Sequence, residues 1–173
     1  MEENSQVSTR SIGIKYGLIS ALIGIIFFIL MDFLGLQGNR AAQWSGLIVT
    51  AVIIYFAHRE YKSIGDGYMQ YGQGVGIGVW VGLVGSVISA TFTFIYVKYI
   101  NPGYLEVIRQ QQIMQMEERG MSDAEIERAM EMSENFSGPG AMFIFGIIFG
   151  FILTLIIALV ISAITKNNRP EVA

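Results

Sequence analysis

The sequence has no cysteine, three prolines, one histidine and few charged residues. Without thiols it forms neither a disulfide framework nor a thiolate metal site. Asp, Glu, Lys and Arg make up 14% of its 173 residues, against about 25% in an ordinary soluble domain. The formal net charge is −3 and the chain has no basic cluster, which argues against a nucleic-acid-binding protein. With 53% hydrophobic residues and a mean hydropathy of +0.51, the composition is that of a membrane protein.

Four apolar stretches approach or exceed the roughly 20 residues that a helix needs to cross the hydrocarbon of a bilayer. We expect membrane spans at about 12–36, 41–57, 72–97 and 140–165. Trp44 lies near the start of the second span and Tyr55 near its end, an aromatic pair typical of the two membrane interfaces. All four stretches are apolar all round, whereas each helix of a water-soluble bundle would carry a polar face. The predicted fold class is therefore all-α, an integral-membrane four-helix bundle that forms a single domain over 1–173.

The basic residues predict the orientation of this bundle. With four spans, both termini and the loop after the second span share one side of the membrane. That side carries six basic residues close to the span ends: Arg10, Lys15, Arg59, Lys62, Lys166 and Arg169. Most basic residues of the opposite side lie in one long loop, where they influence orientation weakly. We therefore expect both termini to face the cytoplasm.

Small side chains recur at every fourth residue in the third and fourth spans. The ridge of the third span consists of Gly74, Gly78, Gly82, Ser86 and Ala90, and that of the fourth of Gly146, Gly150, Thr154, Ala158 and Ser162. No hydrophobic effect drives one helix against another in lipid, so close approach through small residues supplies the packing. We predict that the two ridges pack against each other within one chain, the alternative being a contact with a second copy.

No catalytic, cofactor or metal site is expected. The glycine-rich run 72–78 does not fit a dinucleotide-binding fingerprint, because Ile77 occupies a required glycine position and no strand precedes the run. A single histidine without cysteine does not form a zinc site of the usual kinds. We expect this residue, His58, to belong to an interfacial charged cluster that faces lipid headgroups.

Two charged residues bracket the first span. Lys15 is expected to extend its ammonium group to the cytoplasmic interface. Asp32 is expected to mark a solvated helix end, with a cation site near the outer face as the alternative. They lie 17 positions apart, about 25 Å of helix, so they do not pair with each other.

The segment 101–139 before the last span is expected to lie outside the membrane, with a helical hairpin over about 104–134. Ser122 and Glu125 have the spacing of a capping box and predict the start of its second helix. Three residues of that helix share one face and are predicted to offer it to a partner: Ile126, Ala129 and Met130. The alternative places this apolar edge on the membrane or on the bundle.

Several short stretches carry a resemblance to a known family. They are Ile64-Gly65-Asp66-Gly67-Tyr68-Met69, Tyr71-Gly72-Gln73-Gly74, and Phe94-Ile95-Tyr96 leading into Ile100-Asn101-Pro102. Over nearly its full length the chain resembles the small four-span membrane proteins of Bacteroidota that form a domain family of unknown function. The resemblance implies the inner membrane of a Gram-negative cell, and it implies no activity.

The expected function is that of an inner-membrane protein without catalysis of its own, an accessory or scaffold subunit that acts through helix–helix association. Its expected partners are membrane lipids and either a second copy of the chain or another envelope protein, without nucleic acid and without a cofactor. The alternative is a small oligomeric transporter or channel, with Asp32, Thr50 or Thr154 exposed to its pore.

Overall fold

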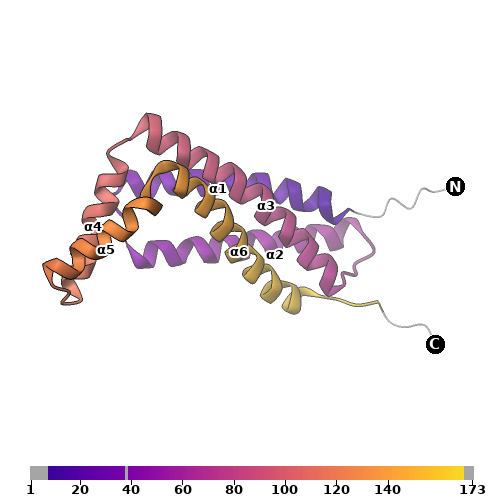
Figure 1. Cartoon of the computed structure of the whole chain (residues 1–173). Coiled ribbons are helices and arrows are strands. Elements are labelled where there is room, and N and C mark those ends of the chain that lie inside the picture. The colour runs from indigo at the N-terminus through magenta and orange to yellow at the C-terminus, as the bar shows by residue number, and fades with distance from the viewer. Residues whose placement is uncertain (1–7, 38, 170–173) are drawn as a thin grey trace.

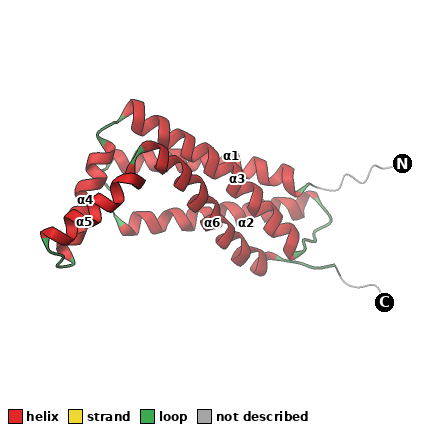
Figure 2. Cartoon of the chain, in the orientation of Figure 1, coloured by secondary structure: helices red, strands yellow, loops and turns green. Residues whose placement is uncertain are grey.

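The computed structural model describes residues 8–37 and 39–169, with side chains except at residues 40, 43 and 134–137. The part that it describes is helical and has no strand, only an isolated bridge between Met69 and Asn167. Four long helices pack along one another, and two shorter helices lie at one end (Figures 1 and 2). The expected all-α class is confirmed.

The long helices are α1 (Thr9–Phe33), α2 (Arg40–Ile64), α3 (Tyr71–Ile95) and α6 (Pro139–Thr165). A π-helical turn, η1 (Tyr96–Ile100), extends α3, and α4 (Tyr104–Glu118) and α5 (Asp123–Ser137) connect it to α6. Ser8 and Asn39 cap α1 and α2 through their side-chain oxygens. The turn after α1 uses Gly35 at a φ of 65°, a conformation that glycine adopts without strain.

Within the residues that the structure describes, three segments are long and apolar enough to span a membrane: Thr9–Phe33, Tyr71–Ile100 and Pro139–Thr165. They contain most of the first, third and fourth spans expected from the sequence. α2 contains the second expected span, 41–57, and is not one of the three. It has the same length as α1, 25 residues, but its last two turns carry His58, Arg59, Glu60 and Lys62.

α3 lies between α1 and α6 and packs extensively against both. A Cβ atom added at Gly78 would lie 2.1 Å from Cβ of Ala158, and one added at Gly74 would lie 2.8 Å from Oγ of Ser162. The two small-residue ridges therefore face each other within the chain, at distances that only glycine permits. This is the close backbone approach that small residues allow in lipid.

A different face of α3 receives α1. A Cβ atom added at Gly13 would lie 2.4 Å from Cβ of Trp80, and one added at Gly17 would lie 2.7 Å from Cβ of Val84. Glycines of α1 thus accommodate large side chains of α3, whereas glycines of α3 accommodate small side chains of α6. α3 is held on two faces as a result.

The buried core lies near the end of the molecule from which the N- and C-terminal segments leave, which we call the terminal end (Figure 1). Its members are Ile12, Ile53, Ile54, Ala57, Tyr61, Met69, Ile77, Val81 and Ala158. At the opposite end, the loop end, α4 and α5 contact each other and α5 contacts α6. α2 and α6 are in contact at the terminal end and diverge toward the loop end (Figure 1).

The start of α5 has the expected capping box. The backbone N–H and the hydroxyl of Ser122 each donate to Oε2 of Glu125 at 2.8 Å. These two donors stabilise the charged carboxylate and hold the pKa of Glu125 below its usual value. The spacing of Ser122 and Glu125 in the sequence therefore predicted this helix start correctly.

Candidate functional site

A cavity of about 380 Å³ lies between α1, α2, α3 and α6, in the half of the molecule toward the loop end. It forms where α2 and α6 diverge. Five glycines belong to its lining and keep its walls free of side chains: Gly24, Gly46, Gly85, Gly146 and Gly150. A Cβ atom added at Gly46 would meet only Phe27, at 3.9 Å, so the space beside this glycine is open.

Hydroxyl groups supply most of the polarity of the cavity. Six residues carry them: Ser20, Thr50, Ser86, Ser89, Thr93 and Thr154. None of the lining residues is ionisable. The hydroxyls of Thr50 and Thr154 donate to Gly46 O at 3.0 Å and to Gly150 O at 2.8 Å, so they offer only acceptor lone pairs to a further group.

Three other hydroxyls of the lining are able to donate. Ser20, Ser89 and Thr93 have no hydrogen-bond partner among residues 8–37 and 39–169. The cavity therefore presents uncharged donors and acceptors on an apolar wall. This lining suits a neutral molecule with oxygen atoms and leaves an ionic group without a counter-charge.

The residues singled out from the sequence divide between this cavity and the helix contacts. Five ridge residues line the cavity: Ser86, Ala90, Gly146, Gly150 and Thr154. Gly74, Gly78, Ala158 and Ser162 make close contacts between α3 and α6, and Gly82 packs against Phe151 and Thr154. Of the residues considered for a pore, Thr50 and Thr154 line the cavity and Asp32 does not.

Asp32 instead anchors the loop end. Its carboxylate accepts hydrogen bonds from Oη of Tyr96 at 2.5 Å, Nε2 of Gln37 at 2.6 Å and Nδ2 of Asn101 at 3.1 Å. The helix end expected to be solvated is partly buried, and its carboxylate is paired with three neutral donors, Gln37 after α1, Tyr96 of η1 and Asn101 after η1. Within the described ranges no group of three His, Cys, Asp or Glu residues is placed to hold a metal ion.

An aromatic cluster surrounds this anchor and joins α4 to it. Tyr104 at the start of α4 lies 5.3 Å from Phe28 and 6.4 Å from Tyr96, measured between ring centroids. Burial raises the pKa of Tyr104 to about 12, and the nearby charge of Asp32 adds to this shift. Its phenol is therefore neutral at physiological pH, which fits an apolar contact between α4, α1 and η1.

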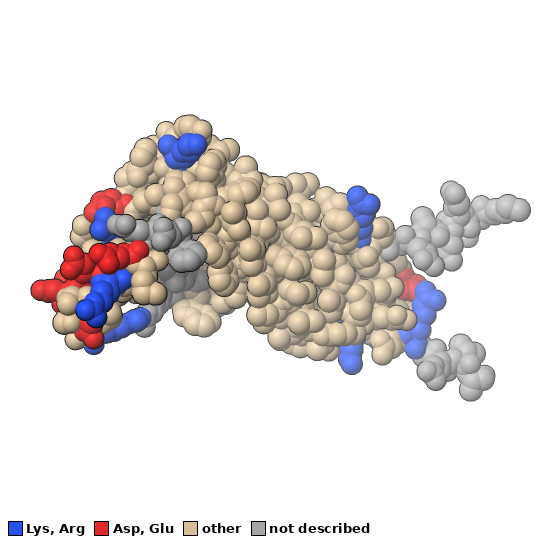
Figure 3. Space-filling model, in the orientation of Figure 1, with Lys and Arg blue, Asp and Glu red and all other residues tan. Residues whose placement is uncertain are grey.

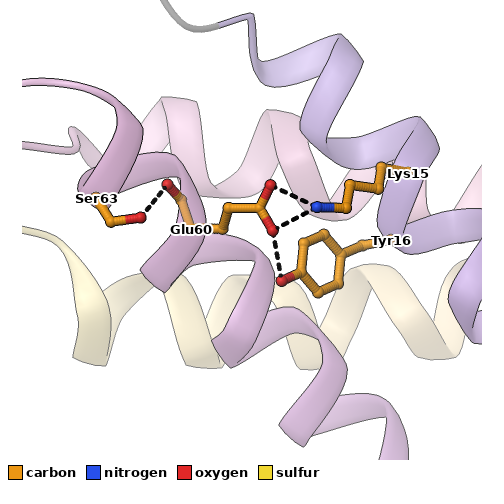
Figure 4. A network of polar contacts seen from close by, with 4 residues as sticks. All are labelled: Lys15, Tyr16, Glu60 and Ser63. Carbon is orange, nitrogen blue, oxygen red and sulfur yellow. Dashed lines mark hydrogen bonds and ion pairs between the residues drawn. The ribbon is translucent and has the colours of Figure 1, made fainter.

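A second polar cluster joins α1 to α2 at the terminal end (Figure 4). The carboxylate of Glu60 accepts from Nζ of Lys15 at 2.7 and 2.8 Å and from Oη of Tyr16 at 2.9 Å. Ser63 donates to the backbone carbonyl of Glu60. Lys15 is 55% exposed, so its ammonium group is both paired and in reach of water.

Loss of this ion pair is expected to have a modest effect. Replacing Glu60 by Gln should lower the free energy of unfolding by about 0.5–1 kcal/mol, because a partly exposed pair gains little over water. Thermal unfolding in bilayers measures this as a small fall in Tm. Tyr16→Phe, which keeps the ion pair, is the matched variant, and its Tm should fall less. An equal or larger loss in Tyr16→Phe would contradict this assignment.

His58 is fully buried where α2, α3 and α6 meet. Its Nδ1 lies 2.8 Å from Oγ1 of Thr165, the last residue of α6, and its Nε2 lies 3.0 Å from the carbonyl oxygen of Gly74. Lys62 donates to the carbonyl oxygen of Thr165 at 3.1 Å. The expectation that His58 faces lipid headgroups is therefore wrong, because α3 and α6 cover it.

The face predicted to bind a partner is covered by the chain itself. Ile126 and Met130 are only 7% and 8% exposed, and Ala129 is partly buried. Ile126 and Met130 line a cleft between α4 and α5 together with Ile113 of α4. A short connection folds the two helices against each other, so the apolar side of α5 packs on α4 in this conformation.

The charged residues gather toward the two ends of the molecule. On the face that Figure 3 shows, the middle is free of Lys, Arg, Asp and Glu. Lys15 and Asp32 mark the two polar clusters and are separated by about 25 Å of helix at 1.5 Å per residue. That distance approaches the hydrocarbon thickness of a bilayer, about 30 Å, and the cavity lies between the two clusters.

The described part of the chain is helical, has three helices long and apolar enough to span a membrane and has an apolar middle zone, the features of a helical membrane protein. Residues 15–167 match the family described as "Protein of unknown function (DUF4199)", and the chain belongs to this family. No curated protein and no solved structure matches the chain significantly. Membership of a family of unknown function, expected from the resemblance, is confirmed.

Proposed function

We propose that the protein crosses the inner membrane of a Gram-negative cell four times, with both termini in the cytoplasm and α4 and α5 outside. α2 supports the fourth crossing because it is as long as α1 and contacts both α1 and α6. Its exposed side chains include five apolar or aromatic ones: Trp44, Ile48, Val52, Tyr55 and Phe56. In water such a row would be an exposed apolar patch, whereas in a bilayer it meets lipid.

Within this topology the protein binds a neutral, membrane-borne molecule in the cavity between the four long helices. The hydroxyl-lined cavity at the middle of the apolar zone is the observation that carries this function. Its volume of about 380 Å³ falls within the range of small-molecule sites, about 300–1,000 Å³. Its lining combines residues of α2 and α6, the two helices that diverge toward the loop end (Figure 1).

The lining defines the kind of molecule that fits. An apolar chain or ring is matched by the isoleucine, valine and glycine walls, and one or two oxygen atoms are matched by the hydroxyls of Ser20, Ser89 and Thr93. A phosphate or ammonium headgroup would lie among residues without charge and would lose its hydration. The proposed occupant is therefore a neutral lipid-like molecule with a hydroxyl or carbonyl oxygen.

Native mass spectrometry of the full chain, extracted gently from its own membrane, tests this function. The wild-type protein is expected to retain one small neutral molecule per binding site. Gly46→Leu fills the open space beside Phe27 and should abolish retention, because the added side chain occupies the cavity. Gly72→Leu is the control, since Gly72 lies outside the cavity and a Cβ atom added there meets nothing within 4 Å.

Equal retention in Gly46→Leu and in the wild type would contradict binding in the cavity. A wild-type protein that carries no small molecule would contradict it as well. Circular dichroism of each variant establishes that loss of the bound molecule does not follow from loss of the fold.

A second candidate function, an accessory subunit that acts by association, is favoured by the exposure of two methionines. Met114 of α4 and Met132 of α5 are 51% and 76% exposed, and methionine suits adaptable contact surfaces. The same mass spectra would then contain a second protein at fixed stoichiometry. Met132→Glu should remove that protein and leave the fold intact, because the side chain touches little of its own chain.

A further inference from the structure

His58 joins three helices at a point where the cavity does not reach. It is the only histidine of the chain and it is 0% exposed. Both ring nitrogens have a partner, Thr165 at the end of α6 and Gly74 near the start of α3. Histidine is the side chain whose ordinary pKa lies nearest to neutral pH, so a buried histidine that links three elements is a candidate for a pH-dependent contact.

The partners of His58 restrict where its protons lie. A carbonyl oxygen only accepts, so the 3.0 Å contact with Gly74 requires a proton on Nε2. Thr165 has one hydroxyl proton, and its Oγ1 lies 2.7 Å from Ile161 O as well as 2.8 Å from Nδ1 of His58. The hydroxyl therefore donates either to the carbonyl oxygen of Ile161 or to Nδ1 of His58, but not to both.

Two hydrogen-bonded states follow from this geometry. When the Thr165 hydroxyl donates to Ile161, Nδ1 must carry a proton and donate to Thr165, and the ring is a positively charged imidazolium. When the hydroxyl turns and donates to Nδ1, the ring is neutral with its proton on Nε2. In both states each polar atom of His58 has a partner, which is what burial demands.

We propose that His58 is a proton-binding site coupled to the last turn of α6, an inference independent of the cavity. Uptake of one proton from water at Nδ1 turns the Thr165 hydroxyl from the ring to Ile161. The carbonyl oxygen of Thr165 also accepts a hydrogen bond from Lys62. Two residues later, Asn167 forms the isolated backbone bridge with Met69. The proton thus changes the hydrogen bonding at the junction of α2, α3, α6 and the segment after α6.

The two hydrogen-bond partners of the His58 ring, Thr165 and Gly74, are not titratable groups. The titratable groups on the elements packed around His58 are Lys15, Tyr16, Arg59, Glu60, Tyr61, Lys62, Asp66, Tyr68, Tyr71, Lys166 and Arg169. Both acidic groups are engaged elsewhere, Glu60 with Lys15 and Tyr16, and Asp66 with Arg169. Among residues 8–37 and 39–169 no carboxylate therefore takes the ring proton, and the Thr165 hydroxyl is the group that responds to it.

Because the chain has one histidine, full-length protein labelled with ¹⁵N-histidine gives one pair of ring-nitrogen NMR signals. We would record them in lipid bilayers from about pH 4 to about pH 8, around the ordinary histidine pKa of about 6.5. The neutral form is expected to carry its proton on Nε2 and the acid form on both nitrogens. A neutral ring with its proton on Nδ1, or a ring that never titrates in this range, would overturn the proposal.

Variants test the coupling to Thr165. Thr165→Val removes the acceptor of the charged ring and should shift the midpoint to lower pH by about one unit, because a hydrogen bond to a charged group is the stronger of the two that are lost. Thr91→Val is the matched control, since its hydroxyl makes the same type of bond, to Val87 O, at an exposed position of α3. An unshifted midpoint in Thr165→Val, or an equal shift in Thr91→Val, would overturn the coupling.

Discussion

Gly78→Leu is expected to separate α3 from α6 and to leave no stably folded protein in the membrane. A Cβ atom alone at this position would lie 2.1 Å from Cβ of Ala158, which is fully buried, so neither side chain has room to move. Even Gly78→Ala should cost about 1–3 kcal/mol, the range of overpacked cores, and the three further carbons of leucine add to this. Thermal unfolding in bilayers measures both variants.

The control for this prediction lies on the same helix. A Cβ atom added at Gly72 meets nothing within 4 Å, so Gly72→Ala should be neutral or should stabilise α3 by up to about 1 kcal/mol through helix propensity. A Gly78→Ala protein as stable as Gly72→Ala would show that the two small-residue ridges do not pack as described.

Asp32→Ala is expected to destabilise the loop end by about 3 kcal/mol. The change removes the common acceptor of Tyr96, Gln37 and Asn101. One hydrogen bond to a charged group contributes about 1.5–3 kcal/mol, and water replaces part of the three lost bonds because Asp32 is only partly buried. Tyr96→Phe removes one donor and keeps the carboxylate, so its loss should be smaller. The free energy of unfolding of both variants measures this difference.

Hydrogen exchange locates the effect of Asp32→Ala. Amides of η1 and the first turn of α4 should lose protection, while those of the core around Ile54 and Ala57 should keep it, because the core lies at the other end of the molecule. Unchanged exchange at Tyr96–Ile100 would contradict the role of Asp32 as an anchor of the loop end.

The sequence predicted those features that depend on short-range spacing. The ridge of Gly74, Gly78 and Gly82 is visible because a helix brings every fourth residue to nearly the same side. The capping box of α5 is visible for a similar reason, since Ser122 and Glu125 are three residues apart. Hydrophobic length located the long helices but not all of their ends, since α2 continues to Ile64 and the second expected span was 41–57.

Contacts between distant residues could not be predicted in this way. Lys15 and Glu60 are 45 residues apart, Asp32 and Tyr96 are 64 apart, and His58 and Thr165 are 107 apart. The sequence around each polar group does not identify its partner, because the relative rotation of two helices decides which side chains meet. The cavity is similar, because four helices supply its lining and Gly24 and Gly46 belong to neither ridge.

The amphipathic pattern of α5 predicted an apolar face, and in the structure this face lies against α4. Ile126 and Met130 do need a covering surface, and α4 supplies it through the short connection between the two helices. A hydrophobic pattern indicates that a face is buried and does not identify what buries it.

Site-directed labelling of single cysteines tests most directly whether α2 crosses the membrane. The natural chain has no cysteine, so Leu34→Cys in the exposed turn before α2 and Ser63→Cys near the end of α2 each create the sole thiol. A membrane-impermeant maleimide applied to intact spheroplasts should label Leu34→Cys, and it should label Ser63→Cys only after lysis. Labelling of both variants from outside would mean that α2 does not cross and would contradict the four-span arrangement around the cavity.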